Sequence, residues 1–120
     1  MEVQVFGVKK SADTRKALRF FAERRIRTHF VDLQERAASP GELQRFAQKF
    51  GVASLIDDKS KRFAELGLAH ARLSDQRWLE KFVDEPLLLR MPLVRQIGAG
   101  AKGLSVGAAE AEWKGWVTSA

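Results

Sequence analysis

The chain has 120 residues, a length typical of one domain, and no apolar run near the roughly 20 residues that a membrane-spanning helix needs. It contains no cysteine, which excludes disulfides, thiol catalysis and cysteine-ligated metal sites. Its formal net charge of +6 permits contact with nucleic acid or an acidic protein surface but requires neither. We expect a soluble, cytoplasmic protein without a signal peptide or a membrane segment.

The first part of the chain predicts a strand, a helix and a second strand. Valines alternate with polar residues over 2–6, apolar side chains recur at helical spacing over 13–25, and alternation returns over 27–33. Residues 9–12 form the turn from the first strand into the helix. Because consecutive strands separated by a helix form crossover units, we expect these two strands to pair in parallel.

The middle of the chain predicts helices only. The segment Ser39–Glu42 combines an N-cap serine, a proline at the first helical position and a capping-box glutamate, and its helix ends at Gly51. Residues 52–73 indicate loops and short helical turns. A further helix is predicted over 75–83, and Pro86 begins one more turn.

The last part of the chain predicts two strands and a helix. Residues 91–95 and 103–107 are expected to form strands joined by a glycine-rich hairpin turn, and residues 108–117 form the closing helix. Trp113 and Trp116 lie on one side of that helix, together with Val117. Burial in the core is the default for such a face, rather than a dimer surface, so we expect a monomer.

These elements predict an α/β protein with a mixed sheet of four strands, in the order βαβ, helical insertion, ββα. The sheet and its helices are expected to come from residues of about 1–36 and 88–120. The inserted helical subdomain is expected over about 37–87.

Ser11 has the most informative position, in the turn before the first helix. Free amides and the helix dipole favour an anion there, and a cysteine at this position would have a lowered thiol pKa. A serine hydroxyl without an adjacent base is a poor nucleophile. Ser11 is therefore either the N-cap of the helix, the commonest role of serine at such a site, or part of an unreactive ligand site.

The basic residues and the two histidines carry weaker signals. The cations lie mainly along predicted helices, and we favour a solvated basic face over a nucleic-acid footprint, so direct nucleic-acid binding is not expected. His29 and His70 lie far apart in the sequence without partners at ligand spacing, so no metal site is predicted. His29 is interpreted as a half-exposed residue of the second strand.

Four segments in this order resemble the arsenate reductase and Spx group of thioredoxin-like proteins, and the resemblance covers almost the whole chain. They are Phe6-Gly7-Val8-Lys9-Lys10-Ser11-Ala12-Asp13-Thr14-Arg15-Lys16-Ala17, Phe63-Ala64-Glu65-Leu66-Gly67-Leu68, Pro86-Leu87-Leu88-Leu89-Arg90-Met91-Pro92-Leu93-Val94 and Val106-Gly107. The resemblance implies a thioredoxin-like core with a helical insertion and a cis proline, matched by Pro92, that faces the nucleophile.

The resemblance also shows what this chain lacks. Ser11 matches the catalytic cysteine of the family, and Thr14 matches the second cysteine of its redox-switch regulators. Asp57 and Met91 match two of the arginines that hold the oxyanion in the reductases, although Arg90 lies one residue before Met91. A third arginine is matched by Val106, less securely because the preceding loop can absorb gaps.

Two functions follow from this resemblance. The first is a non-catalytic binding or regulatory module, with RNA polymerase or another protein as its partner, as the Spx regulators imply. The alternative is a glutathione-dependent thiol or arsenate reductase-like enzyme whose catalytic cysteine has been replaced by Ser11. No cofactor is expected apart from glutathione, and the candidate ligand-binding residues are Lys9, Lys10, Ser11, Arg15, Arg90 and Pro92.

Overall fold

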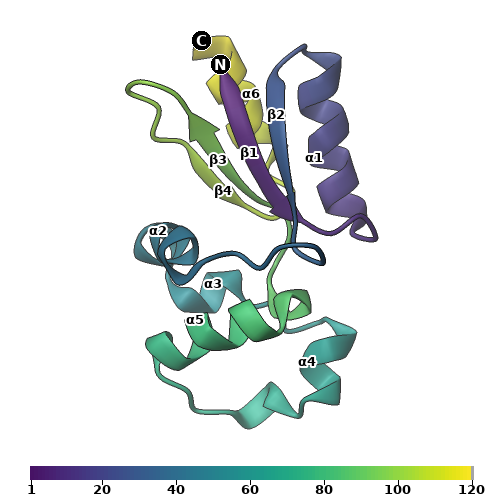
Figure 1. Cartoon of the computed structure of the whole chain (residues 1–120), viewed down its shortest axis with the longest axis vertical. Helices are drawn as coiled ribbons and strands as arrows, with labels where there is room; N and C mark the ends of the chain where they lie inside the picture. The colour runs from purple at the N-terminus through teal and green to yellow at the C-terminus, as the bar shows by residue number, and fades with distance from the viewer. Residues whose placement is uncertain (120) are drawn as a thin grey trace. The chain divides into compact units, whose positions relative to one another are not determined.

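The computed structural model describes residues 1–119 and divides into two compact units. One unit comprises Met1–Arg36 together with the chain from Met91 onward, and the other comprises Ala37–Arg90. We call them the sheet unit and the helical unit and describe each by itself (Figure 1).

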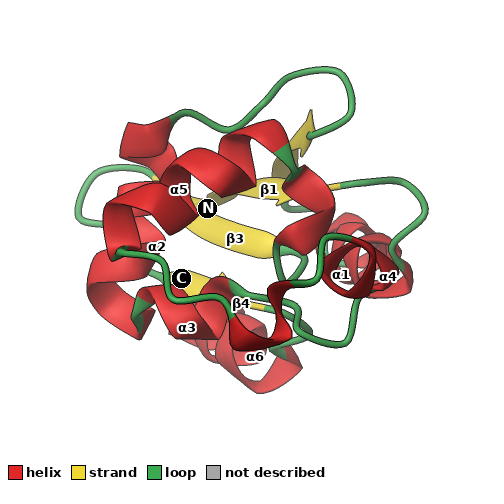
Figure 2. Cartoon of the chain, turned by 90° about the horizontal axis from the view of Figure 1, so that it is seen from below, coloured by secondary structure: helices red, strands yellow, loops and turns green. Residues whose placement is uncertain are grey.

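The sheet unit is built on a mixed sheet of four strands. The parallel pair consists of β1 (Glu2–Gly7) and β2 (Arg27–Asp32), and β3 (Leu93–Ile97) runs antiparallel to β1. The short strand β4 (Leu104–Val106) pairs antiparallel with β3, which gives the order β2-β1-β3-β4. The strands are yellow in Figure 2. The predicted α/β class and its mixed four-stranded sheet are confirmed.

Two helices pack on one face of this sheet. Helix α1 (Ala12–Glu23) connects β1 to β2, and helix α6 (Glu110–Ser119) follows β4. Both contribute to one core cluster that also contains Val3 and Val5 of β1 and Val94 of β3. The alternation of the first strand therefore has the predicted orientation, with its valines turned toward the helices.

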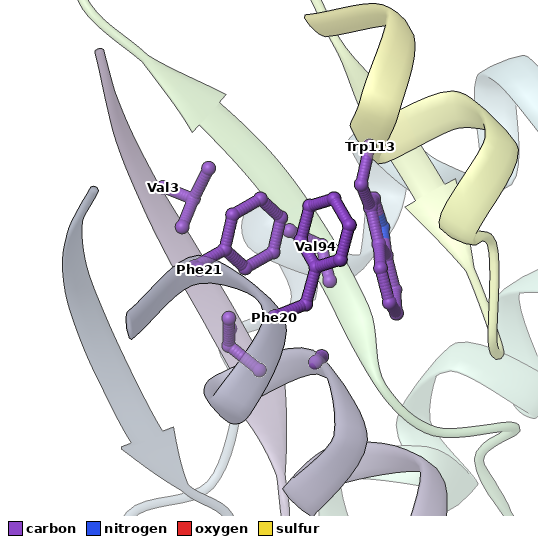
Figure 3. Packing of buried hydrophobic residues seen from close by; sticks show 7 residues of the cluster. Val3, Phe20, Phe21, Val94 and Trp113 are labelled. Carbon is purple, nitrogen blue, oxygen red and sulfur yellow. The ribbon is translucent and has the colours of Figure 1, made fainter. Parts of the chain in front are cut away.

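Three aromatic rings fill the space between the helices and the sheet. The ring centroids of Phe20 and Phe21 are 5.1 Å apart, and each lies 5.5 Å from the Trp113 ring. The planes of Phe20 and Phe21 are nearly perpendicular, and Figure 3 shows the three rings side by side with Val3 and Val94 near them. Trp113 is completely buried, and its indole Nε1 donates a 2.8 Å hydrogen bond to Ser105 Oγ of β4. Trp113 is therefore a core residue, and its one polar group has a partner.

The opposite face of the sheet carries polar side chains near the start of β1. Glu2 lies opposite Arg27, and Gln4 lies between His29 and Arg95 in the strand register. His29 Nε2 lies 2.9 Å from a Glu2 carboxylate oxygen, and Arg95 donates to the Gln4 side chain at 3.2 Å. The hydrogen bond from His29 lowers the pKa of Glu2. His29 is thus an exposed residue of β2.

The largest differences from the predicted element boundaries, two residues each, are in α1, β3 and α6. Helix α1 ends at Glu23 rather than at residue 25, because Arg25 has a left-handed backbone with φ of 57°. Its N–H bonds to Ala22 O and that of Ile26 bonds to Phe21 O, which is the Schellman pattern of a helix end. Strand β3 begins after Pro92, which has no N–H to donate, and α6 is shifted by two residues.

The helical unit contains four short helices and two 3₁₀ turns. Three of its helices begin at N-cap serines: Ser39 with the predicted capping box, Ser60 and Ser74. No long helix is predicted in this part of the sequence, because glycine, proline and serine interrupt the apolar pattern repeatedly. The elements are α2 (Pro40–Phe50), α3 (Val52–Leu55), α4 (Lys61–Glu65), η1 (Leu68–His70), α5 (Asp75–Asp84) and η2 (Pro86–Leu88).

An ion pair joins α4 to the end of α5. The Arg62 guanidinium donates two hydrogen bonds to the Glu85 carboxylate, at 2.8 and 2.6 Å. This pairing lowers the pKa of Glu85 and raises that of Arg62. The bidentate pair thus connects α4, which has only five residues and no fully buried side chain, to the C-terminal end of α5.

We predict that Ser105→Ala destabilises the protein. The substitution leaves the buried Trp113 N–H without its acceptor, and an unpaired buried donor costs about 1–3 kcal/mol. Urea unfolding followed by tryptophan fluorescence measures the change. The exposed Ser119→Ala serves as the control and should stay within about 0.5 kcal/mol of wild type. An equally small effect at Ser105 would contradict the assignment of this hydrogen bond.

A second prediction concerns pH. Because the folded pKa of Glu85 lies below the ordinary value of 4.5, its ion pair contributes stability at higher pH, and that contribution is lost as pH falls through the lowered pKa. Glu85→Gln should therefore be less stable than wild type at pH 7, and the difference should shrink below pH 4.5. Thermal unfolding of both proteins across pH 3–7 tests this, and a pH-independent difference would count against it.

Candidate functional site

The turn between β1 and α1 holds the residue at the expected nucleophile position. Ser11 has an extended backbone, and its Oγ accepts a 3.1 Å hydrogen bond from Thr14 N. Its own N–H donates to Val8 O, which closes the turn. Ser11 is therefore the N-cap of α1, and Asp13 takes the first-turn acidic position. The hydroxyl is engaged in holding the helix end.

The cations of this turn have different surroundings. The Arg15 guanidinium donates a 2.7 Å hydrogen bond to Lys9 O, so Arg15 braces the turn from the helix. Lys9 Nζ lies 4.0 Å from an Asp32 carboxylate oxygen at the end of β2. Lys10 is exposed and makes no ion pair with any residue in 1–119. Four of the predicted ligand residues, Lys9, Lys10, Ser11 and Arg15, thus lie together in this turn and the first helical turn.

Thr14 lies beneath the turn and packs against the end of β1. It is completely buried, and no described residue offers its Oγ1 a hydrogen-bond partner. A Cβ added at Gly7 would overlap Thr14 Oγ1 and come within 2.6 Å of its Cγ2. The close approach therefore requires glycine at position 7. Sequence reasoning missed this contact, and its one available signal was a glycine at the end of a buried strand.

Pro92 lies in the same unit, at the start of β3. The Met91–Pro92 peptide bond is cis, as the family resemblance implies, and Pro92 O accepts a 2.9 Å hydrogen bond from Gly107 N. Pro92 is buried and Met91 is partly exposed. Val106 lies in β4, opposite Leu93 in the strand register. None of these side chains carries a charge that could neutralise an oxyanion.

Arg90 and Asp57 belong to the helical unit. Arg90 N donates to Leu55 O at 2.8 Å, and its guanidinium is 3.5 Å from Ile56 O. The Asp57 carboxylate accepts from Lys59 N two residues later, which stabilises its own turn. The carboxylate at this expected arginine position therefore has a local structural role.

The described residues carry no other grouping with obvious chemistry. Within 1–119, no set of three or more histidine, aspartate or glutamate side chains could hold a metal ion. No helix in the same range is long and apolar enough to cross a membrane. The turn before α1 is therefore the site on which a functional argument can be built.

The unpartnered hydroxyl of Thr14 leads to a prediction. Thr14→Val keeps the shape that packs on Gly7 and removes the hydroxyl, so the free energy of unfolding should be unchanged or higher, by up to about 3 kcal/mol. Chemical denaturation measures it. Thr118→Val, at an exposed position of α6, is the matched control and should have little effect. A clear destabilisation confined to Thr14→Val would mean that the hydroxyl has a partner.

Comparison with known proteins places the chain among solved structures with the same fold. The YffB protein matches with a TM-score of 0.82 and 18% identity, over 94% of this chain and 96% of its own. An arsenate reductase from Vibrio cholerae matches with a TM-score of 0.71 and 25% identity, over 86% and 90%. An arsenate reductase related protein from Brucella melitensis matches with a TM-score of 0.67 and 19% identity, over 97% of this chain and 94% of its own.

No curated protein matches the chain. The ArsC family, however, matches residues 6–116, a range that includes the turn with Ser11, the whole helical unit and the start of β3. The resemblance seen in four sequence segments and the thioredoxin-like fold of the solved structures agree with this match. The chain is a member of the ArsC family, and one without cysteine.

Proposed function

We propose that this protein is an ArsC-family member that has lost thiol chemistry and acts as a non-catalytic binding or regulatory module. The observation that carries the proposal is the state of Ser11. Its hydroxyl stands at the family's nucleophile position and accepts the hydrogen bond that caps α1. The chain has no cysteine elsewhere that could take over.

The chemistry of the family's reaction supports this proposal. Reduction of arsenate needs a thiolate to attack arsenic and cationic groups to neutralise the oxyanion. A serine hydroxyl would need an adjacent base, and no hydrogen bond joins Ser11 Oγ to a histidine or carboxylate among the described residues. Two positions matched to oxyanion-holding arginines carry Met91 and Asp57, and Asp57 brings a negative charge.

The partner proposed for such a binding module is a protein. The resemblance to the Spx regulators suggests RNA polymerase as that partner. Without cysteine at positions 11 and 14, such binding would not respond to oxidants. Serine and threonine fill these positions with groups that stay unchanged under oxidising conditions. Binding would therefore be constitutive.

A second candidate is binding of glutathione or an oxyanion without reaction, as a remnant of the reductase site. Lys10 favours it, because this exposed cation lies beside the N-terminus of α1 and has no ion pair within residues 1–119. Lys9, Arg15 and Pro92 are the other candidates in the sheet unit, whereas Arg90 belongs to the helical unit. The reductase-like enzyme whose cysteine has become Ser11 is the corresponding catalytic alternative.

Restoring the sulfur separates these functions. We expect wild type to reduce no arsenate with glutathione and glutaredoxin as reductants. Ser11→Cys should gain a thiol with a lowered pKa, seen as rapid alkylation by iodoacetamide at neutral pH, and still turn over no arsenate because the oxyanion-holding arginines are missing. Turnover by Ser11→Cys would instead favour the enzyme alternative.

Two controls complete this experiment. Ser11→Ala removes the cap and should lose about 1 kcal/mol of stability without changing any activity. Titration of wild type with glutathione, followed by amide chemical shifts, tests the second candidate. Movement confined to residues 9–14 would support the remnant site, whereas unchanged shifts together with direct binding of purified RNA polymerase would support the regulatory module.

A further inference from the structure

The positive charge of the chain is concentrated in one segment. Residues 9–27 contain eight lysines and arginines but only two acidic residues, Asp13 and Glu23. This segment therefore has a net charge of +6, equal to that of the whole chain, and the rest is balanced at thirteen of each sign. All eight basic side chains are exposed. We call them the α1 basic surface: Lys9, Lys10, Arg15, Lys16, Arg19, Arg24, Arg25 and Arg27.

The packing of α1 accounts for this arrangement. The helix buries Thr14, Ala17, Phe20 and Phe21, so its remaining positions turn outward. Arg15 and Arg19 are four residues apart, so they follow one another along the outer face about one helical turn, or 5.4 Å, apart. The turn before α1 and the connection to β2 lie at opposite ends of the helix (Figure 1), and both carry further exposed cations.

These charges are only weakly compensated within the protein. The shortest lysine or arginine distances to carboxylates on this surface are 3.9–4.0 Å, from Lys9, Lys16 and Arg27. Arg19 and Arg25 make no ion pair with any residue in 1–119. Exposed pairs at such distances neutralise little of the field, so the surface retains a strong positive potential.

Arg25 is an independent sign that charge is favoured here. It occupies the left-handed position of the Schellman motif at the end of α1, where glycine fits best because it has no Cβ. The neighbouring Arg24 is held firmly, with its guanidinium carbon 3.7 Å from the Phe20 ring centroid and a hydrogen bond to Phe20 O. Arg25 thus carries a basic side chain at a left-handed backbone position that favours glycine.

Although the sequence alone favours a solvated basic face, the exposure of these side chains and their weak pairing lead us to propose that the α1 basic surface binds the phosphate backbone of double-stranded nucleic acid, without sequence preference. Protein interfaces depend on apolar or aromatic anchors, and the outer face of α1 exposes none, only Ala12 and Ala22 besides polar residues. Single strands are bound by aromatic stacking, and the aromatic residues of α1 are buried. The same burial leaves no apolar face to enter a membrane. This function goes beyond the protein-binding role proposed above and does not depend on it.

The test uses the full chain and a fluorescein-labelled 20-base-pair DNA duplex, with anisotropy measured between 50 and 200 mM salt. The test variant is Arg19→Gln/Arg25→Gly, which leaves Arg15 and Arg24 in their structural contacts. The matched control is Arg45→Gln/Arg72→Gln, which removes two exposed cations of the helical unit and the same net charge. Because glycine suits the backbone at position 25, the test variant should unfold no more readily than wild type.

We expect wild type to bind the duplex with a salt-dependent affinity. The affinity of the test variant for the duplex should fall about tenfold or more at low salt. The slope of its plot of log affinity against log salt should be smaller in magnitude by about two. The control should stay within about twofold of wild type. Equal losses in the two variants, or binding of a single-stranded 20-mer as tightly as the duplex, would overturn the proposal. Equally effective competition by polyglutamate would overturn it in favour of an acidic protein partner.

Discussion

The packing of three aromatic rings between two helices and the sheet determines how everything else in the sheet unit is presented. Phe20 and Phe21 come from α1 and Trp113 from α6, and their contacts with β1 and β3 leave α1 only one rotation about its axis. In that orientation Thr14 packs against the end of β1, and Arg15 and Arg19 point to the outside. The position of the Ser11 turn and the composition of the outer surface are therefore consequences of the same packing.

This arrangement explains why the fold survives without the sulfur that its family uses. No described contact that holds the sheet unit together depends on the chemistry of residue 11 beyond one hydrogen-bond acceptor at the end of α1. Serine is among the best residues for that task. The end of α1 is well capped by serine, so the fold does not require a sulfur atom at position 11.

Much of the fold was predictable because the signals were local. Alternation in β1, the capping box at Ser39 and the glycine-rich hairpin each depend on a few neighbouring residues. The C-terminal end of α1 and the start of β3 were predicted less well. The first depends on a left-handed arginine that no propensity favours, and the second on a proline that delays the strand. Both depend on backbone geometry that residue type only loosely specifies.

The site was predictable in outline and not in its detail. The turn, its cations and the cap followed from the strand-to-helix pattern and the family resemblance. The unpartnered hydroxyl of Thr14 did not, because it arises from the approach of α1 to Gly7, seven residues earlier in the chain. The concentration of charge in residues 9–27 was visible in the sequence, but the outward orientation of Arg15, Lys16 and Arg19 required the packing of α1.

The contact between Gly7 and Thr14 limits volume rather than polarity. The end of β1 accepts a side chain of this size and leaves its oxygen unused, so a methyl group could take the place of the hydroxyl. Position 14 can therefore change its chemical character while its shape stays constant. A polar and an apolar side chain of the same shape can therefore exchange at this position without moving the backbone of β1 or α1.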